Sequence, residues 1–268
     1  MAITHAILDS RALITLGGPD WRSFLQGLIT QDVDTLAAGE IRFGALLTPQ
    51  GRLLYDLFVL GGDDGCKLDV EAAHRDALIQ RLTIYRLRAK VEIAADAAAV
   101  AVLFPGPLEP TNGWSVDPRL PALGLRGYGQ AAPSDAQADD ESAYDAHRLA
   151  LGVPGPADWG SEKAYPIEAD FDLLGGIDFK KGCFVGQETT SRMKRRGQIK
   201  TRMAPIAFDG PALPAGAEVL AGDLRAGEVL SGGAGRAIAL LRLDRMTTAP
   251  LTVDGRAVRV DAPAWLES

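Results

Sequence analysis

The residues that could do chemistry are concentrated in one octet, Lys181-Gly182-Cys183-Phe184-Val185-Gly186-Gln187-Glu188. It places the thiol of Cys183 between two glycines and close to two lysine ammonium groups. The residues that follow contain few helix breakers, so we expect Cys183 near a helix N-terminus. A helix N-terminus and neighbouring ammonium groups both favour a thiolate. The octet therefore predicts a functional thiol; the alternative is a small buried apolar residue, as free cysteines usually are.

The octet begins a basic segment in an acidic chain. The net charge of the protein is −7, whereas residues 180–202 carry +7, which leaves −14 for the rest. Its cations are Lys180, Lys181, Arg192, Lys194, Arg195, Arg196, Lys200 and Arg202, against the single acid Glu188. Such a segment predicts a local anionic partner, such as a polyglutamyl tail, a phosphate, an acidic protein or RNA. The alternative is a solvated helix end, which favours cations.

Composition excludes several classes of protein. Of the 268 residues, 47% are hydrophobic and 24% charged, which is typical of a globular protein with a large core. No apolar run is long enough to span a membrane, and Met1 to His5 lack the pattern of a secretory signal. The two cysteines, Cys66 and Cys183, do not suggest a disulfide framework. We therefore expect a cytoplasmic, reduced protein without a membrane partner.

The pattern of residues predicts an α+β body followed by a β module. Apolar residues at helical spacing indicate helices after Pro19 and over residues 73–86, and an acidic first turn indicates another at 139–151. Alternating stretches indicate strands, with a hairpin over residues 43–60, whereas 105–121 reads as loop or boundary. After Arg202, short strands separated by Gly/Pro turns are typical of a small barrel or sandwich.

The octet resembles the signature of the YgfZ family, which is related to the aminomethyltransferase (T-protein) of the glycine cleavage system and has mitochondrial members that serve iron–sulfur cluster assembly. The resemblance covers most of the chain. Further matching segments are Asp9-Ser10-Arg11, Phe24-Leu25-Gln26-Gly27-Leu28-Ile29-Thr30-Gln31-Asp32, Pro166-Ile167-Glu168, Gly175-Gly176-Ile177-Asp178-Phe179 and Arg192. It implies a three-lobed arrangement, with two intertwined α+β lobes in a folate-binding body at 1–200 and a C-terminal β-barrel at 201–268.

The resemblance also implies a function. We expect a folate-binding factor that supports the assembly or repair of iron–sulfur proteins, with tetrahydrofolate as ligand and assembly or client proteins as partners. Its functional residues would be those of the motif: Lys181, Gly182, Cys183, Phe184, Gly186, Gln187, Glu188 and Arg192. Cys183 would engage a cluster donor, a sulfur species or a client thiol. The alternative is a tetrahydrofolate-dependent aminomethyl or one-carbon transferase.

Two acids are candidates for folate contacts, Asp56 and Glu168. Asp56 lies in an apolar strand, where a carboxylate is costly unless it is paired, so it could face a pocket and act as base; the alternative is that it points to water. Glu168 could lie near the folate channel or be an ordinary capping carboxylate. T-proteins carry further acids where this chain has Tyr55 and Ala150. Their loss argues against aminomethyl transfer, so we expect little or no catalysis.

Metal and nucleic-acid sites have little support in the sequence. The three histidines are widely separated, and two cysteines cannot complete a four-thiolate cluster site, so we expect no metal bound by this chain alone. Phosphate-loop and dinucleotide motifs are absent. An RNA-interaction module over Lys180 to Arg202 is a third possibility, but Phe184 is its only aromatic residue, and the acidic chain argues against it.

Overall fold

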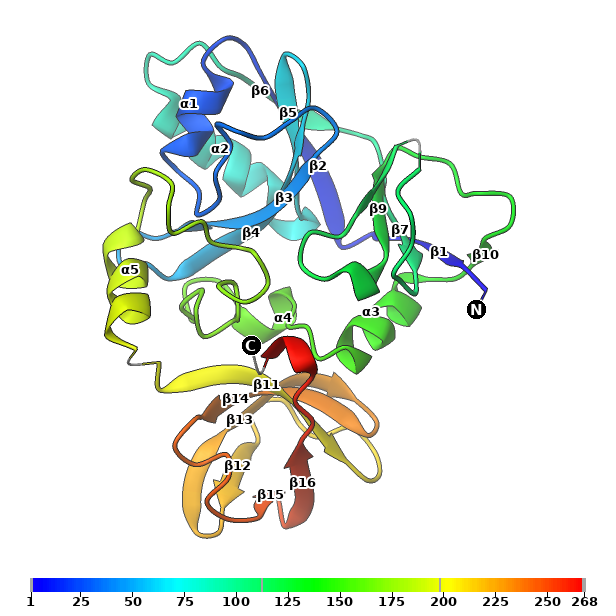
Figure 1. Ribbon diagram of the computed structural model, residues 1–268, viewed down its shortest axis with the longest axis vertical. Coiled ribbons are helices and arrows are strands. Elements are labelled where there is room, and N and C mark those ends of the chain that lie inside the picture. Colours follow the sequence, from blue (N-terminus) through cyan, green and yellow to red (C-terminus); the bar gives the residue numbers. More distant parts are fainter. Residues whose placement is uncertain (1, 112, 198, 267–268) are drawn as a thin grey trace.

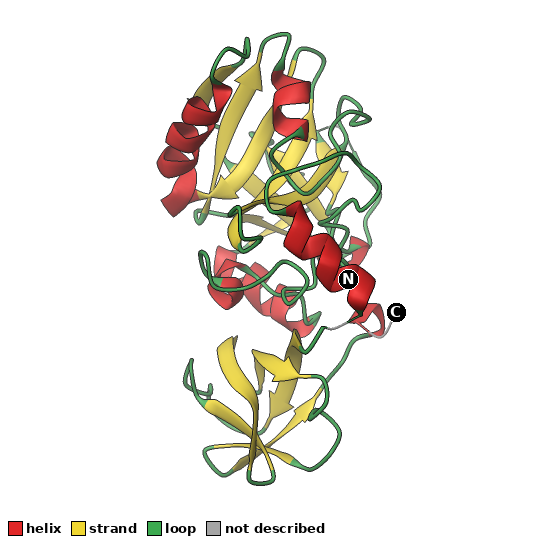
Figure 2. Ribbon diagram, turned by 90° about the vertical axis from the view of Figure 1, so that its left-hand side faces the viewer, coloured by secondary structure: helices red, strands yellow, loops and turns green. Residues whose placement is uncertain are grey.

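The computed structural model describes residues 2–111, 113–197 and 199–266, which form three lobes (Figure 1). Two α+β lobes, each built around a five-stranded sheet, lie above a closed six-stranded barrel. In the turned view of Figure 2 the barrel lies at one end of the molecule, below the two other lobes. The predicted α+β architecture with a C-terminal barrel is confirmed.

The first lobe has a sheet that is buried on both faces except at the edge strand formed by Glu92–Asp96. Leu13 of one strand packs into the cluster shared with the second lobe, whereas the next residue, Ile14, packs under the helices. Burial on both faces explains the nearly continuous apolar runs of its strands. Its strands, in spatial order, are β3 (Ile41–Leu47), β4 (Leu53–Gly61), β5 (Gly65–Glu71), β2 (Arg11–Gly17) and β6 (Glu92–Asp96). The helices are α1 (Trp21–Gln26), the 3-10 turn η1 (Ala72–His74) and α2 (Arg75–Arg86), which buries Leu78 and Leu82.

The second lobe is interleaved with the first along the chain. Its strands, in spatial order, are β10 (Gln137–Ala138), β1 (Thr4–Ile7), β7 (Val100–Phe104), β9 (Leu125–Tyr128) and β8 (Trp114–Val116). Because β1 precedes the whole first sheet and β7 follows it, the two lobes are intertwined. The interpretation of 105–121 as loop is wrong in part, since Trp114 begins β8 there and is buried despite its Gly/Pro-rich surroundings. The turn η2 (Pro121–Leu123) and the helices α3 (Glu141–Ala150) and α4 (Pro156–Trp159) complete this region.

The third lobe is the barrel. Its strands, in spatial order, are β11 (Thr201–Phe208), β14 (Arg236–Arg242), β13 (Leu224–Gly233), β12 (Glu218–Ala221), β15 (Leu251–Val253) and β16 (Arg256–Val260). Alternate residues of these strands fill an apolar interior. The short strand β15 was not predicted, because three residues are too few to show an alternating pattern. Helix α5 (Gln187–Arg196) precedes the barrel, and the turn η3 (Ala264–Leu266) follows it.

A buried ionic network joins the two sheets. Asp69 on β5 is fully buried and accepts hydrogen bonds from Arg11 Nε on β2 at 2.6 Å and from Arg126 Nη2 on β9 at 2.5 Å. Arg11 also pairs with Asp56 on β4 at 2.8 Å. The guanidinium carbon of Arg126 lies 3.9 Å from the centroid of the Phe58 ring. Burial would raise the pKa of Asp69, but Arg11 and Arg126 outweigh it and lower the pKa.

The network continues through Asp117, which follows β8. Its carboxylate accepts from Arg119 Nη2 at 2.8 Å and from Arg126 Nη1 at 3.4 Å. Arg119 in turn donates to the hydroxyl of Tyr144 on α3. Three arginines and three aspartates thus balance their charges between the lobes, and each charge depends on its partners because all six side chains are largely shielded from solvent.

Replacing Asp69 with alanine tests this network. Asp69→Ala leaves Arg11 and Arg126 buried without their shared carboxylate, so we expect the free energy of unfolding to fall by about 3–5 kcal/mol. Urea denaturation monitored by circular dichroism measures the change. Asp63→Ala, which removes an exposed carboxylate from the turn before β5, is the control and should change stability by less than about 0.5 kcal/mol. Equal stabilities of the two variants would contradict the network's role.

Candidate functional site

Two segments that the sequence resemblance singled out separately form one site. The thiol loop (residues 175–186) lies on the anchor loop (residues 26–32), which precedes β3. Thr30 Oγ1 donates to Gly176 O at 2.6 Å, and the Asp178 amide donates to Thr30 O at 3.0 Å. Gln31 Nε2 adds a bond of 2.6 Å to Gly175 O. The N-terminal motif therefore acts as the support on which the cysteine motif is held.

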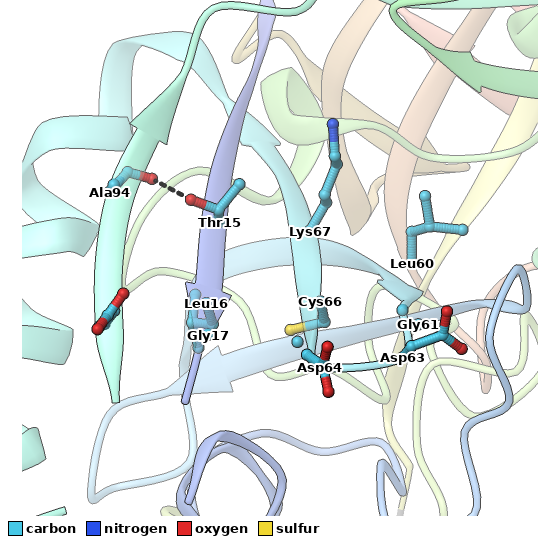
Figure 3. Close-up of a pocket in the computed structure, with 13 residues that line it drawn as sticks. Thr15, Leu16, Gly17, Leu60, Gly61, Asp63, Asp64, Cys66, Lys67 and Ala94 are labelled. Atoms are coloured by element: carbon cyan, nitrogen blue, oxygen red, sulfur yellow. Dashed lines mark hydrogen bonds between the residues drawn. The ribbon is translucent and has the colours of Figure 1, made fainter. Parts of the chain in front are cut away.

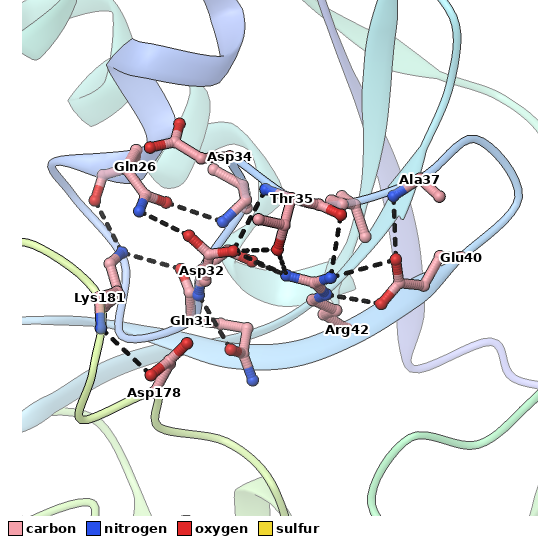
Figure 4. A network of polar contacts seen from close by, with 12 residues as sticks. Gln26, Gln31, Asp32, Asp34, Thr35, Ala37, Glu40, Arg42, Asp178 and Lys181 are labelled. Atoms are coloured by element: carbon pink, nitrogen blue, oxygen red, sulfur yellow. Dashed lines mark hydrogen bonds and ion pairs between the residues drawn. The ribbon is translucent and has the colours of Figure 1, made fainter.

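Lys181 makes the central contact between these loops. Its ammonium donates to the backbone carbonyls of Gln26 and Ile29 at 2.7 Å each and of Gln31 at 2.8 Å. All three donor positions of the ammonium are thereby used. Burial lowers the pKa of Lys181 to about 8, against the attraction of neighbouring carboxylates. In the sequence Lys181 lies close to the thiol, but in the structure its side chain points into the protein and anchors the loop (Figure 4).

The anchor loop is itself held by a polar network around Asp32 (Figure 4). The Asp32 carboxylate accepts from Gln26 Nε2 at 2.7 Å and from Arg42 Nη1 at 3.0 Å, and it also accepts from the Thr35 hydroxyl. Burial would raise the pKa of Asp32, but the hydrogen bonds outweigh it and lower the pKa to about 2. Glu40 fixes Arg42 through a bond of 2.7 Å. The carbonyls around Lys181 thus belong to a rigid loop.

Two further residues of the octet face inward. Phe184 is buried in the main core, and Lys181 Nζ lies 5.4 Å from the centroid of its ring. Gly186 has φ +80° at the N-cap of α5, where an added Cβ would come within 2.6 Å of Thr48 O in the β3–β4 turn. Glycine is required there by both backbone and space. By contrast, Gly182 has open space around it, so it does not constrain the loop.

The remaining octet side chains reach solvent. Cys183 is exposed and lies three residues before Gly186, the N-cap of α5, so it is near the helix as predicted but outside its first turn. Glu188 and Arg192 form an exposed pair one helical turn apart, at 2.5 Å. Gln187 is half-buried at the start of the helix. The alternative that Cys183 is a buried apolar residue is therefore wrong.

The second thiol has the opposite environment. Cys66 lies on β5 and is buried, and burial raises its pKa to about 12. It lines a cavity of about 400 Å³ at the end of the first sheet, together with Leu16, Lys67 and the acidic turn at Asp63 and Asp64 (Figure 3). A thiol with such a pKa stays protonated at neutral pH and is a poor nucleophile. Cys66 is therefore a natural internal control for Cys183.

Much of the basic segment is paired within the protein. Lys194 pairs with the buried carboxylate of Asp172 at 3.1 Å, and Arg202 pairs with Asp170 at 2.7 Å and Asp172 at 2.9 Å. These pairs attach α5 and the start of the barrel to the residues that precede the thiol loop. Over the described part of the chain, no carboxylate is paired with Lys180, Arg195 or Lys200. The side chain of Arg196 lies outside the described part of the structure. The segment therefore presents fewer free cations than its sequence suggests.

Asp170 is the unusual member of this cluster. Its Oδ1 accepts from Arg202, but Oδ2 is buried without a hydrogen-bond partner. Its backbone is also left-handed, with φ +61°. Burial raises the pKa of Asp170 to about 7, although Arg202 opposes the change. The carboxylate therefore exchanges its proton near neutral pH.

Asp56 faces the protein interior and not solvent. Its carboxylate pairs with Arg11, whereas Tyr55 points to the opposite face of β4, against the ring of His74. A cavity of only about 60 Å³ lies beside it, bounded by Arg11, Phe58, Arg119, Arg126 and Tyr144 among others. Pockets for ligands of the size of a folate measure roughly 300–1,000 Å³. These side chains as they stand do not fit tetrahydrofolate, so its binding at Asp56 stays a prediction.

Glu168 is used in a structural contact. Its Oε2 accepts from the Tyr165 amide at 2.9 Å, and its Oε1 accepts from the Thr201 hydroxyl at 2.6 Å. The carboxylate thereby ties residues 165–168 to the first barrel strand. It is not among the described residues that line the cavity at Asp56, so the structure does not bring the two candidate acids together there. A folate contact by Glu168 stays a prediction.

Sequence reasoning missed the partners of these residues. Arg11 was noted only as part of a matching segment, and Asp69, Arg119 and Arg126 were not noted at all. For Arg11, Asp69 and Arg126 the available signal was a charged residue inside a largely apolar strand, which is costly unless paired. Among the described residues no group of three or more His, Cys, Asp or Glu side chains is arranged to hold a metal. None of the described helices has both the length and the apolarity needed to cross a membrane.

Comparison with known structures shows the fold. The chain is similar to the glycine cleavage system aminomethyltransferase T from Bartonella henselae, with a TM-score of 0.79 over 99% of this chain and 87% of that one. Sequence identity is 17%, so this likeness concerns the fold alone. Residues 200–268 match the family model of the CAF17 C-terminal beta-barrel domain.

Comparison with curated proteins identifies relatives along most of the chain. The iron–sulfur cluster assembly factor IBA57 of Homo sapiens is 31% identical over 82% of this chain and 74% of its own length. The Mus musculus protein of the same name is 31% identical over 96% of this chain and 84% of its own length. The Neurospora crassa homolog is 32% identical over 78% of this chain, but the match spans only 55% of that longer protein. This chain spans just over half the length of that fungal relative and of the one from Pyricularia oryzae.

These names correct one prediction. Each of these relatives is named as a mitochondrial protein, so the cytoplasmic location predicted from the sequence is wrong. The prediction depended on the few cysteines and on the residue types of Met1 to His5. A low cysteine count indicates a reducing compartment but does not distinguish one such compartment from another.

Removing the ammonium of Lys181 should loosen the thiol loop. Lys181→Met keeps the length of the side chain but leaves three carbonyls without their donor, which costs about 1–3 kcal/mol for a buried polar group. We expect faster hydrogen exchange of the amides in residues 175–186, measured by mass spectrometry. Lys180→Met, at the neighbouring exposed lysine, is the control. Unchanged exchange in the Lys181 variant would show that the ammonium does not hold the loop.

The titration of Asp170 should be visible in the pH dependence of stability. Because its folded-state pKa is about 7 and its ordinary value is 3.8, the folded protein holds a proton that the unfolded chain releases. Its contribution to stability is therefore fully present below pH 4 and is lost as the pH rises to about 7. Relative to the wild type, Asp170→Asn should gain stability over this range, by up to about 4 kcal/mol.

Chemical denaturation at a series of pH values measures this difference. Asp254→Asn is the matched control, because Asp254 is exposed and shares the left-handed backbone, with φ +48°. A difference between wild type and Asp170→Asn that does not change with pH would rule out titration of this carboxylate in the folded state.

Proposed function

The chain belongs to the family of IBA57 iron–sulfur cluster assembly factors, and from this premise we propose that it supports the assembly or repair of iron–sulfur proteins through the thiol of Cys183. The proposed role of this thiol is supported by the way the loop exposes it to solvent. Cys183 is exposed on a loop whose neighbouring Lys181 is fixed by three backbone carbonyls. Within this family we propose a protein of the YgfZ type, on the basis of the octet.

The proposed chemistry needs a second protein. Cluster sites are usually held by several thiolates, and Cys183 supplies one. The cluster, or the sulfur or client thiol, is thus cargo that Cys183 engages together with groups of a partner. Cys66 is buried on the first sheet, so it is not presented to a partner as Cys183 is. We therefore place the partners among the iron–sulfur assembly proteins and their clients.

Folate binding is a separate part of the proposal. The T-protein-like fold supports tetrahydrofolate as a ligand, whereas the small cavity at Asp56 requires that arginine side chains move before it could enter. We assign no transfer step to this ligand. The role of Asp56 supported by its contacts is to balance the charge of Arg11.

A complementation experiment tests the thiol. In cells that lack the gene, Cys183→Ala should fail to restore the activity of iron–sulfur enzymes such as aconitase, because the group that engages the cargo is removed. We expect restored activity to fall at least about tenfold, measured in extracts at equal amounts of the protein. Cys183→Ser, which keeps the size but not the sulfur, should behave in the same way.

The matched control is Cys66→Ala, which removes the buried thiol. It should restore enzyme activity as the wild type does, once its amount in the cell is matched. Full rescue by Cys183→Ala would remove the thiol from the mechanism and leave the fold and the family as the only supported statements.

A further inference from the structure

A groove of about 640 Å³ lies beside α5, next to the thiol loop. One wall is a face of the helix, because its residues recur at helical spacing. The other side is the ring of Phe179, which belongs to the thiol loop itself. The groove is lined by Phe179, Gln187, Glu188, Ser191, Lys194 and Arg195. Cys183 lies on the short stretch of chain between Phe179 and Gln187, so the groove and the thiol share their supporting loop.

Phe179 gives the groove an apolar surface. It is 37% exposed, and it is one of a few large hydrophobic side chains that the described structure leaves in contact with solvent. The ammonium of Lys194 lies 5.5 Å from the centroid of its ring, while its charge is paired with Asp172. The ring is therefore held in place on one side and open on the other. An apolar side chain of another molecule could cover the open side.

The charge of the groove is positive. Arg195 is exposed, and its Nε donates to the backbone carbonyl of Ser191 at 3.3 Å, one helical turn earlier. Lys180, next to Phe179, is also exposed, and in the described structure neither cation is paired with a carboxylate. Glu188, the acid in the lining, is already paired with Arg192. Arg195 thus lines the groove together with the apolar ring, and Lys180 directly follows Phe179 on the loop that leads to the thiol, in a protein whose net charge is −7.

We propose that this groove docks an acidic segment of a partner protein that carries a large apolar side chain. The apolar side chain covers Phe179, and the acids pair with Arg195 and Lys180. A segment seated in this way brings the partner's cargo to Cys183 on the same loop. The inference rests on the proposed function, because it names the partner chemistry of the same site.

Other occupants fit less well. Single-stranded RNA binds by stacking bases on several aromatic rings, and this groove offers one ring with an acid at its edge. A second copy of the chain carries the same net charge of −7, so two copies repel each other at long range. The combination of one apolar ring and two free cations matches an acidic peptide segment.

Fluorescence anisotropy with a defined probe tests the docking. The probe is a short fluorescein-labelled peptide in which glutamates and aspartates flank a central Leu-Phe pair, and its control has serines in place of that pair. We expect saturable binding of the first peptide and about tenfold weaker binding of the second. Arg195→Glu should weaken binding about tenfold or more by reversing a contact charge, and Ser191→Trp should do so by filling the groove. Arg88→Glu, at an exposed arginine that follows α2, is the matched control and should bind as the wild type does.

Several outcomes would overturn the docking inference. These are no saturable binding, binding that Arg195→Glu and Ser191→Trp leave unchanged, tighter binding to a single-stranded RNA than to the peptide, and displacement of the peptide by self-association of the chain. Cys183→Ala separates this inference from the proposed function, because it should keep peptide binding while losing rescue. If the peptide binds and Cys183→Ala rescues fully, only the proposed role of the thiol is contradicted. If Cys183→Ala fails to rescue but the protein does not bind the peptide, only the docking site is contradicted.

Discussion

Three backbone carbonyls, those of Gln26, Ile29 and Gln31, close around the ammonium group of Lys181. This contact joins segments that lie about 150 residues apart in the chain. A buried ammonium is costly unless every proton finds an acceptor, so the two loops stabilise each other's conformation. The network around Asp32 keeps the three carbonyls in position, and the carbonyls hold the thiol loop through Lys181. Cys183 is thus exposed two residues after a half-buried lysine whose ammonium is held by three carbonyls.

The same loop is linked to the third lobe through charge. Asp170 and Asp172 precede it, and they hold Arg202 at the start of the barrel and Lys194 on α5. A second network, built on Asp69 and its two arginines, holds the first two lobes together and fills the space beside Asp56. The charges beside Asp56 are balanced by the protein's own side chains, whereas the thiol of Cys183 is exposed to solvent.

The sequence predicted the class of the fold and the exposed thiol, because both depend on local patterns. Helix α2 and the barrel strands follow from apolar periodicity, and the octet stands out by its residue types. The sequence could not predict that the Lys181 side chain points inward. A lysine near a cysteine looks the same in sequence whether its ammonium reaches solvent or a distant carbonyl. Nor could it pair Asp56 with Arg11 or Asp170 with Arg202, since those contacts depend on how the lobes are placed. Strands β8, β9, β10 and β15 were missed because each is only two to four residues long and is defined by its neighbours in the sheet.

The most direct test of this account is rescue of iron–sulfur enzyme activity by Lys181→Met in cells that lack the gene. The variant keeps Cys183 and removes only the ammonium that holds its loop. It therefore tests whether function requires the thiol to be held in position as well as to be present. We expect rescue to fall toward that of a protein without the thiol, at equal amounts of protein, whereas Lys90→Met, at an exposed lysine of the first lobe, rescues fully. Full rescue by Lys181→Met would contradict the account, because the thiol would then act without its anchor.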